Sequence, residues 1–187
     1  AFMSDFDQDN SYSEAFYRDY AERYAEVAHQ YLQSVYLNAS HPALKGDDDL
    51  LNHLKTLIHG KRGLDAGCGA GARDVYQFFR AGYDMWGIDA VEENVQIAQK
   101  RHPEIKERVR VHDLREPLPF PDADFDFVTC NAVIQHIEPD DVLGRVLPEL
   151  MRVLRKNGVL QLMFKNGDGV ATVFDEDYDT DRTFLLY

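Results

Sequence analysis

The stretch GLDAGCGAG, residues 63–71, places three alternate glycines directly behind an apolar run that ends in an acid. Gly67, Gly69 and Gly71 carry no side chain, so the backbone there adopts turns closed to other residues and approaches a ligand closely. If a strand turns into a helix at this point, the first helical amides and the positive end of the helix dipole face that ligand. The stretch predicts a strand–loop–helix unit that binds a nucleotide-type cofactor.

The glycine spacing alone leaves two cofactors open. Gly67, Gly69 and Ala72 fit the dinucleotide pattern G-x-G-x-x-G/A, and Asp89 lies roughly 20 residues further on, where a ribose-binding acid is expected. This reading describes an NAD-binding oxidoreductase. Asp65, at the mouth of the loop, would repel a pyrophosphate but suits an ammonium or a sulfonium. S-adenosylmethionine carries both cations, so the sequence favours it over NAD.

Strand-like and helix-like segments alternate after Gly60. We expect a strand up to Ala66, strands over 84–88, 108–112, 125–130 and 159–164, and helices over 72–80, 91–101 and 141–155. Such alternation predicts an α/β fold with a doubly wound, mostly parallel sheet. Pro148 interrupts the apolar repeat of the last helix, which predicts two pieces or a kink there.

The chain ahead of this region reads as helical. A tyrosine stripe with alanines between predicts one long amphipathic helix over 14–37, and a second helix starts at Asp47 and closes at Gly60. We expect residues 1–60 to form a helical cap that belongs to the same domain as residues 61–187. This cap is expected to act as a lid over the cofactor.

Composition and charge limit the kinds of partner that this chain is expected to bind. The 20 basic and 33 acidic residues give a net charge of −13, without the basic stripe that a nucleic-acid binder needs, so no nucleic acid is expected. No apolar run is long enough to span a membrane and no signal-type segment opens the chain, so we expect a cytoplasmic protein without a membrane partner. Cys68 and Cys130 lack metal-site or disulfide spacing, which predicts reduced thiols and no metal. The sequence does not indicate an oligomeric state.

Five segments together resemble the successive motifs of class I S-adenosylmethionine-dependent methyltransferases of the small-molecule branch. They are GLDAGCGAG, the Asp89 of WGID, the HDL of residues 112–114, LPFPDADFDFVTCNAV and ELMRVLRKNGVLQL. The resemblance runs from about Lys61 to Lys165. It implies a Rossmann-like fold, methyl transfer to a small-molecule acceptor by in-line displacement, and S-adenosylhomocysteine as the product.

The resemblance also raises a question at the end of the chain. The sheet of this family normally ends with a helix and an antiparallel hairpin after the fifth strand, whereas this chain stops at TFLLY, residues 183–187. We therefore expect the C-terminal strands of the family to be absent, because the sequence is incomplete or the sheet is shortened. Incompleteness is favoured, since a bare sheet edge risks aggregation.

The resemblance assigns roles to individual residues. Asp65 would orient the methionine ammonium, while amides of the glycine loop hold the methionine carboxylate. Asp89 would accept both ribose hydroxyls, Asp113 the adenine amino group, and the backbone N–H of Leu114 would donate to the ring. The full set of expected cofactor contacts is Tyr24, Asp65, Ala66, Gly67, Cys68, Gly69, Gly71, Asp89, Ala90, Asp113, Leu114, Asn131 and Ala132.

Catalysis is harder to assign. His136 is the nearby side chain whose ordinary pKa suits a general base, although a histidine here is also common scaffolding. Asn131 and Ala132 would contribute mainly backbone beside the methyl group. Two rivals use the same cofactor class: a cofactor-binding regulatory protein without turnover, and a transferase that uses decarboxylated S-adenosylmethionine. The second is disfavoured because Asn131 stands where such enzymes carry acids.

Overall fold

Five parallel strands form the centre of the computed structural model, which describes residues 13–32 and 44–187. They stand in the order β3-β2-β1-β4-β5, and every neighbouring pair is parallel. Strand order therefore reverses between β1 and β4, as in a doubly wound sheet. The predicted α/β architecture is confirmed. The strands are β1 (Arg62–Ala66), β2 (Asp84–Asp89), β3 (Val109–Val111), β4 (Phe125–Asn131) and β5 (Leu154–Met163).

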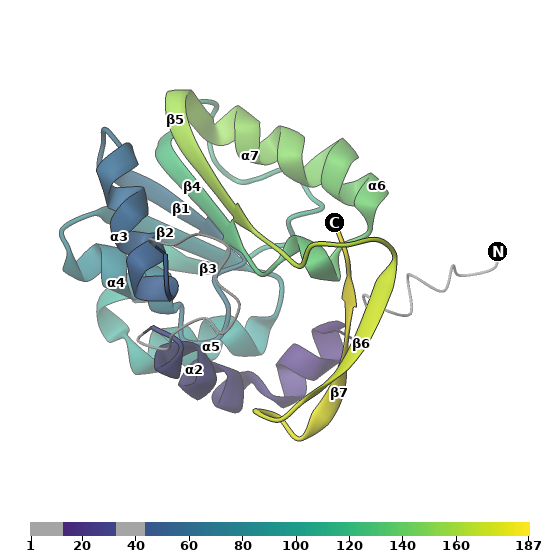
Figure 1. The fold of residues 1–187 in the computed structure, drawn as a ribbon. Helices are drawn as coiled ribbons and strands as arrows, with labels where there is room; N and C mark the ends of the chain where they lie inside the picture. Colours follow the sequence, from purple (N-terminus) through teal and green to yellow (C-terminus); the bar gives the residue numbers. More distant parts are fainter. Residues whose placement is uncertain (1–12, 33–43) are drawn as a thin grey trace.

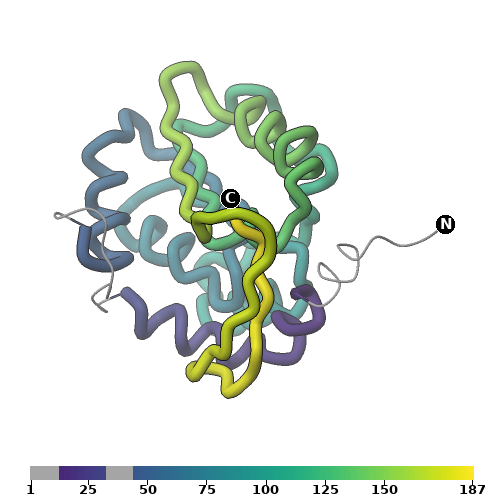
Figure 2. Tube along the Cα trace, turned by 45° about the vertical axis from the view of Figure 1, so that its right-hand side comes forward, coloured from purple at the N-terminus to yellow at the C-terminus, as the bar shows by residue number. Residues whose placement is uncertain are grey.

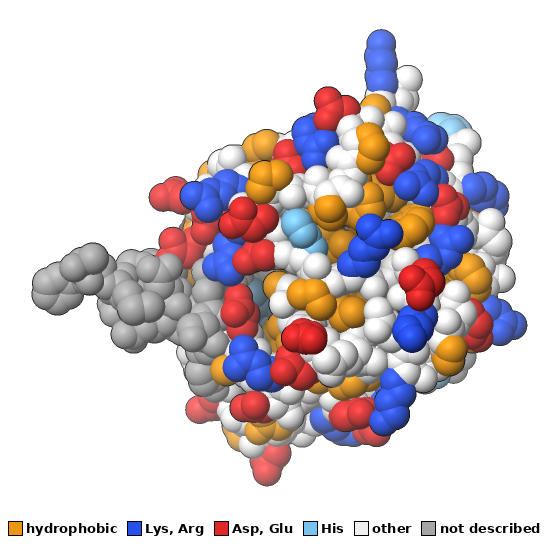
Figure 3. Space-filling model, turned by 180° about the vertical axis from the view of Figure 1, so that it is seen from behind, with side chains coloured by type: hydrophobic (Ala, Val, Ile, Leu, Met, Phe, Trp, Pro, Cys, Tyr) orange, Lys and Arg blue, Asp and Glu red, His pale blue; other side chains and the backbone are white. Residues whose placement is uncertain are grey.

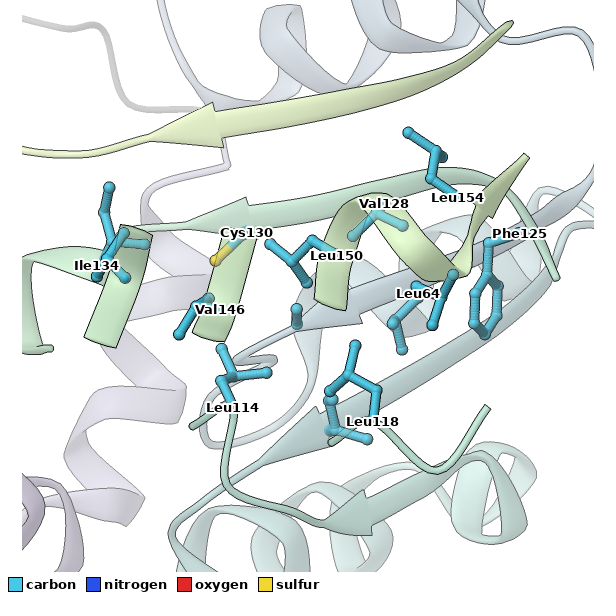
Figure 4. Close-up of a cluster of buried hydrophobic side chains, with 14 residues drawn as sticks. Leu64, Leu114, Leu118, Phe125, Val128, Cys130, Ile134, Val146, Leu150 and Leu154 are labelled. Atoms are coloured by element: carbon cyan, nitrogen blue, oxygen red, sulfur yellow. The ribbon is translucent and has the colours of Figure 1, made fainter. Parts of the chain in front are cut away.

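Helices cover both faces of this sheet (Figure 1). One buried core gathers Phe78, Met85 and Phe127 under the helices on the first face, and a second gathers Leu64, Val128 and Leu150 on the other (Figure 4). Burial on both faces explains why the strands read as nearly continuous apolar runs. The helices are α3 (Asp47–Leu57), α4 (Arg73–Arg80) and α5 (Glu92–Arg101), then α6 (Pro139–Asp141) and α7 (Leu147–Val153); short 3₁₀ turns cover Pro103–Arg108 and Ile134–His136.

The helix around Pro148 is interrupted as predicted. Val142–Val146 forms a π-helical stretch between α6 and α7, and the N–H of Leu147 bonds to the carbonyl of Val142. Proline has no N–H to continue an α-helical ladder, so a change in the hydrogen-bond pattern just ahead of it costs little. The two helical pieces keep one direction across the change (Figure 1).

The N-terminal helix is shorter than predicted and is divided. Residues 13–19 are helical, Tyr20 forms a turn with φ −108° and ψ 15°, and α2 covers Ala21–Gln30. The predicted helix over 14–37 is therefore wrong as one continuous element, and its last residues, 33–37, lie outside the described residues. The ring of Tyr20 stacks on Phe16 at 4.7 Å, and both rings contact Tyr178 far along the chain. We call residues 13–30 the N-terminal helical segment.

The main sheet ends at β5, as expected, but the end of the chain forms a hairpin that the sequence analysis did not predict. β6 (Val170–Asp175) and β7 (Thr180–Leu185) pair antiparallel in a separate two-stranded sheet, so they do not extend the main sheet past β5. The hairpin instead lies against the N-terminal helical segment (Figures 1 and 2). Arg182 of β7 is the centre of this contact, with its guanidinium 4.5 Å from the ring of Phe16 and 5.0 Å from that of Tyr178. Phe16 and Tyr178 are buried there, and such cation–π contacts hold the hairpin in place.

The surface mixes charges of both signs. On the face drawn in Figure 3, acidic and basic side chains are interspersed, and no continuous basic stripe crosses it. Within the described ranges, no helix is long and apolar enough to cross a membrane.

Candidate functional site

The carboxyl ends of β1, β2 and β4 meet where strand order reverses, which is where ligands bind in open α/β sheets. β1 ends beside Asp65, β2 ends at Asp89 and β4 at Asn131. Between β1 and α4 the glycines adopt left-handed backbone angles, with φ of +84° at Gly67, +67° at Gly69 and +85° at Gly71. Only glycine takes up such angles without strain, so the loop can turn this tightly.

The space beside these glycines is filled largely by the protein itself. A Cβ added at Gly69 would lie 2.7 Å from the ring of Tyr24, and one at Gly67 would lie 2.4 Å from Val133. At Gly71 the neighbour is Ala25, at 3.3 Å. The glycines therefore allow the N-terminal helical segment to lie directly on the loop, a role that the sequence did not indicate. Tyr24 is the residue of that segment that touches the centre of the loop.

Several loop amides are already occupied. The N–H groups of Gly67 and Cys68 both donate to the carbonyl of Ile88, at 2.8 and 2.9 Å, and the N–H of Gly69 donates to Asp89. These three amides thus hold β1, β2 and the loop together. These amides are therefore not available to bind a methionine carboxylate. This differs from the role predicted for the loop from the sequence.

Asp89 is buried and well anchored. Its Oδ1 accepts from the Val91 N–H and the Asn94 side chain, and its Oδ2 accepts from Gly69, all within 3.0 Å. Burial raises the pKa of Asp89, while these hydrogen bonds favour the charged form. A carboxylate has about four acceptor positions, so one remains on Oδ2. Asp89 therefore has room for one ribose hydroxyl rather than two.

Asp113 is bound by a neighbour that the sequence analysis missed. The guanidinium of Arg115 contacts both oxygens of Asp113, at 2.6 to 3.0 Å, and the backbone N–H of Arg115 bonds to Oδ1. Partial burial acts to raise the pKa of Asp113, but Arg115 lowers it below its usual value. Arg115 also pairs with Glu14 at 3.3 Å, which ties this strand end to the N-terminal helical segment. An adenine amino group would have to share Asp113 with Arg115.

Two cavities flank the loop. The first measures about 110 Å³, and the second, beneath the hairpin, about 630 Å³. Five residues line both cavities and so mark their junction: Tyr17, Tyr24, Gly67, Asn131 and Ala132.

The structure distributes the predicted contacts between these cavities. The first is also lined by Gly69, Asp89, Ala90, Asp113, Leu114 and His136. Asp65 and Cys68 line the second only. Ala66 and Gly71 line neither, because Ala66 is buried in β1 and Gly71 faces Ala25. Residues that the sequence analysis missed in the first cavity are Ser13, Glu14, Tyr17, Val91, Asn94, Arg115, Val133 and Ile137.

Asp65 is the most perturbed acid of the site. It is only 4% exposed, and its carboxylate accepts a hydrogen bond from the hydroxyl of Thr129 at 2.9 Å. Burial, and next the nearby charge of Asp74, raise its pKa to about 8. A cationic group entering the second cavity would stabilise the carboxylate, so the site is electrostatically suited to an ammonium.

His136 lies in a partly buried network at the end of the first cavity. Its Nε2 is 2.9 Å from the hydroxyl of Tyr17, and its Nδ1 is 3.2 Å from the hydroxyl of Ser13. Arg182 donates to the same Tyr17 oxygen at 2.7 Å, so the Tyr17 proton is directed to Nε2 and Nδ1–H faces Ser13. Burial, then the charges of Arg182 and Lys165, lower the pKa of His136 to about 3. The imidazole is neutral, and both of its nitrogens are engaged.

The two cysteines are unreactive here. Both are buried, and burial raises the pKa of each thiol above its usual value. Neither resembles an activated nucleophile, which needs a lowered pKa. In the described part of the chain, no cluster of His, Cys, Asp and Glu could hold a metal ion.

Comparison with known proteins assigns the class. A family model described as "Methyltransferase domain" matches residues 64–162, more than half of the chain. The chain therefore belongs to this family, the class I S-adenosylmethionine-dependent methyltransferases, whose cofactor is S-adenosylmethionine. The expected family is confirmed.

Curated relatives agree with that assignment. A magnesium-protoporphyrin O-methyltransferase from Rhodobacter capsulatus is 34% identical over 105 residues, which cover 54% of this chain and 44% of that protein. A ubiquinone biosynthesis O-methyltransferase from Paracidovorax citrulli is 34% identical over 146 residues, 73% of this chain and 57% of the relative. The chain spans between 38% and 57% of the length of the curated relatives that it matches.

Solved structures share the fold. The PH0226 protein from Pyrococcus horikoshii OT3 superposes with a TM-score of 0.59 at 21% identity, covering 87% of this chain and 83% of that one. A Haemonchus contortus phosphoethanolamine N-methyltransferase, solved with phosphoethanolamine and S-adenosylhomocysteine, gives a TM-score of 0.61 at 17% identity over 86% of this chain and 33% of its own. At these identities the likeness concerns the fold alone.

Proposed function

We propose that the chain binds S-adenosylmethionine across the two cavities and transfers its methyl group to a small-molecule acceptor. The observation that carries the proposal is the junction lined by Tyr17, Tyr24, Gly67, Asn131 and Ala132. With the nucleoside beside Asp89 and the amino-acid arm beside Asp65, the sulfonium lies at this junction. The acceptor then approaches from the larger cavity. The names of the curated relatives, both O-methyltransferases, support a small-molecule acceptor.

Methyl transfer needs little direct chemical participation by protein side chains. S-adenosylmethionine, when bound, supplies an activated methyl group, whose bond to sulfur breaks as its bond to the acceptor forms. The protein aligns the two partners and excludes water, an effect worth about 7–11 kcal/mol for well-oriented reactants. Tyr17 and Tyr24, both partly buried, supply walls for that alignment. The other predicted contacts that line the cavities keep the roles proposed for them, within the limits found at Asp89, Asp113 and the loop amides, whereas Ala66 and Gly71 line neither cavity.

Titration calorimetry tests the proposal directly. We expect S-adenosylmethionine and S-adenosylhomocysteine to bind and NAD to show no heat of binding, because Asp65 favours a cation beside it and a pyrophosphate brings none. Tight binding of NAD would support the oxidoreductase alternative and contradict the proposal. Release of S-adenosylhomocysteine in a screen of acceptors then separates an enzyme from a regulatory protein that binds the cofactor without turnover.

We also propose that the N-terminal helices belong to the same domain as the sheet. Arg73 at the start of α4 supports this, because its guanidinium bonds to the carbonyl of Ala28 in α2 and to Asp47 in α3, both at 2.7 Å. Burial lowers the pKa of Arg73, but its acidic partners outweigh that effect and hold it charged. One cation thus joins three helices.

The N-terminal helical segment is expected to open for the cofactor. The first cavity, at about 110 Å³, is well below the ~300–1,000 Å³ of typical ligand sites. Binding therefore requires this segment to move away and to close again, as lids do. We expect amides from about Phe16 to Val27 to exchange more slowly with deuterium when S-adenosylmethionine is present. Unchanged exchange there, beside a loop at Gly67–Gly71 that becomes protected, would show that the segment is scaffold.

His136 is expected to position Tyr17 rather than to act as a base. An efficient general base has a pKa near the working pH, and the lowered pKa of His136 makes it a weak one. Once an acceptor is known, His136→Ala should reduce turnover by less than ~100-fold. It should also leave the pH–rate profile between pH 6 and 8 unchanged in shape. Loss of a pH-dependent limb, with cofactor affinity unaltered, would identify His136 as the base.

A further inference from the structure

One side of the second cavity is lined by apolar side chains, and this apolar part continues to the surface. Val173 lies opposite Arg182 in the hairpin register and therefore on the face of the hairpin that looks into the cavity. Phe184 of β7 and Met163 of β5 line the same space. Val173 is nevertheless 46% exposed, and Phe174, which follows it, is 59% exposed. The apolar lining thus runs out of the cavity along β6.

An exposed aromatic ring stands on the opposite rim. Tyr31, just after α2, lines the cavity and is 43% exposed. Its hydroxyl donates to Asp177 in the turn of the hairpin at 2.9 Å, which fixes the ring at the edge of the opening. Exposed apolar side chains gathered at one opening are a typical sign of a binding site. Here they frame the mouth of the larger cavity.

The charges of the wall disfavour an anion. Six acidic and three basic residues line the cavity. Arg73 is paired with Asp47 and Asp74, and Arg182 with Asp175. Lys165, the third base, lies 4.5 Å from the centre of the Phe184 ring. The wall therefore carries an excess of acid in a protein whose net charge is −13.

We propose that the methyl acceptor is a lipophilic molecule without a negative charge, whose apolar tail leaves the cavity between Tyr31 and the Val173–Phe174 edge of the hairpin. The reacting head group lies at the junction of the two cavities. At about 630 Å³, the cavity holds a ring-sized head beside the methionine arm, so a longer tail must follow the exposed apolar rim. This assignment rests on the proposed function and goes further, because it names the class of acceptor and its exit path.

Calorimetry on the full chain saturated with S-adenosylhomocysteine tests the acceptor class. The probes are 4-methylphenol, 4-hexylphenol and 4-hexylbenzoate. A fully buried methylene is worth ~0.8 kcal/mol, about fourfold in affinity, and a half-covered one about twofold. We therefore expect 4-hexylphenol to bind about 30-fold more tightly than 4-methylphenol. The carboxylate of 4-hexylbenzoate should weaken binding about tenfold or more relative to 4-hexylphenol.

Variants locate the tail. Val173→Ser and Phe174→Ser should each weaken 4-hexylphenol about threefold or more while leaving 4-methylphenol and S-adenosylhomocysteine nearly unchanged. The matched control is Leu143→Ser, which removes an apolar side chain that is 67% exposed on the π-helical stretch, away from the cavity. It should change none of these affinities.

The outcomes separate the two proposals. If S-adenosylhomocysteine does not bind, the proposed function fails and this inference falls with it. If it binds, but affinity does not rise with chain length or the benzoate binds more tightly, only the acceptor class is wrong. An equal loss in Leu143→Ser would show non-specific adsorption and would overturn the assigned path.

Discussion

Replacing Gly69 with valine is expected to weaken S-adenosylmethionine binding by more than about 100-fold and to destabilise the fold. Two costs add at this position. The backbone φ of +67° strains any residue with a Cβ, by about 1–2 kcal/mol. The new side chain would also start 2.7 Å from the ring of Tyr24, so the N-terminal helical segment must lift off the loop. Binding of the cofactor and thermal unfolding should both report this change.

Gly82 offers the matched control. Its φ of +84° imposes a similar backbone strain, but nothing lies within 4 Å of an added Cβ. Gly82→Val should therefore be destabilised only by the backbone strain, by about 1–2 kcal/mol, and should keep its affinity for the cofactor. If Gly69→Val and Gly82→Val behave alike, the contact between Tyr24 and the loop has no part in binding.

The sheet could be predicted from the sequence because its signals are local. The expected strand over 84–88 appears as β2, Asp84–Asp89, and the expected helix over 91–101 as α5, Glu92–Arg101. Each is bounded by turn residues and has an apolar pattern of its own. The interruption at Pro148 was equally local, since it follows from one missing N–H. The acids at the strand ends follow from topology once the strands are known.

The covering layer of the site could not be predicted in the same way. His136 meets Ser13 and Tyr17, which lie more than 100 residues earlier in the chain, and Arg182 reaches Tyr17 from the hairpin. The hydrophobic periodicity of helices and strands does not indicate such long-range contacts. One strand of the hairpin could have been predicted locally, because the sequence VATVF of residues 170–174 favours a strand. The family resemblance instead predicted that C-terminal strands are absent.

Arg115 shows a different limit. Its bond to Asp113 spans two residues, and an Asp followed two positions later by Arg is a recognisable local pair. The family pattern suggested an adenine partner for Asp113 and left the nearby cation unconsidered. Residue roles carried over from a family therefore need the side chains around them, as Asp89 also shows with its three internal donors.

Replacing Asp65 with asparagine is expected to make the free protein more stable and the cofactor complex weaker. The pKa of Asp65 is raised from 3.8 to about 8, so the folded state favours the protonated form. Its contribution to stability is complete below about pH 4, the ordinary pKa of an aspartate, and is lost as the pH rises to about 8. Asparagine accepts the same hydrogen bond from Thr129 and never charges.

The gain in stability should therefore depend on pH. Asp65→Asn and the wild type should unfold alike near pH 4, and the variant should be more stable by about 1–3 kcal/mol at pH 8.5. Asp74→Asn is the control, because Asp74 lines the same cavity but is paired with Arg73 at 2.7 Å. Removing that partner should lower stability, the opposite sign.

The same substitution at Asp65 that stabilises the free protein should weaken binding of S-adenosylmethionine. A hydrogen bond between charged groups is worth about 1.5–3 kcal/mol, so losing the carboxylate should weaken S-adenosylmethionine by about 10- to 150-fold. A cofactor analogue that lacks the amino group should bind the variant and the wild type equally, because Asp65 then has no cation to meet. Equal affinity of both proteins for S-adenosylmethionine would show that Asp65 does not contact the cofactor. The burial of Asp65 would then destabilise the fold for no reason connected with this ligand.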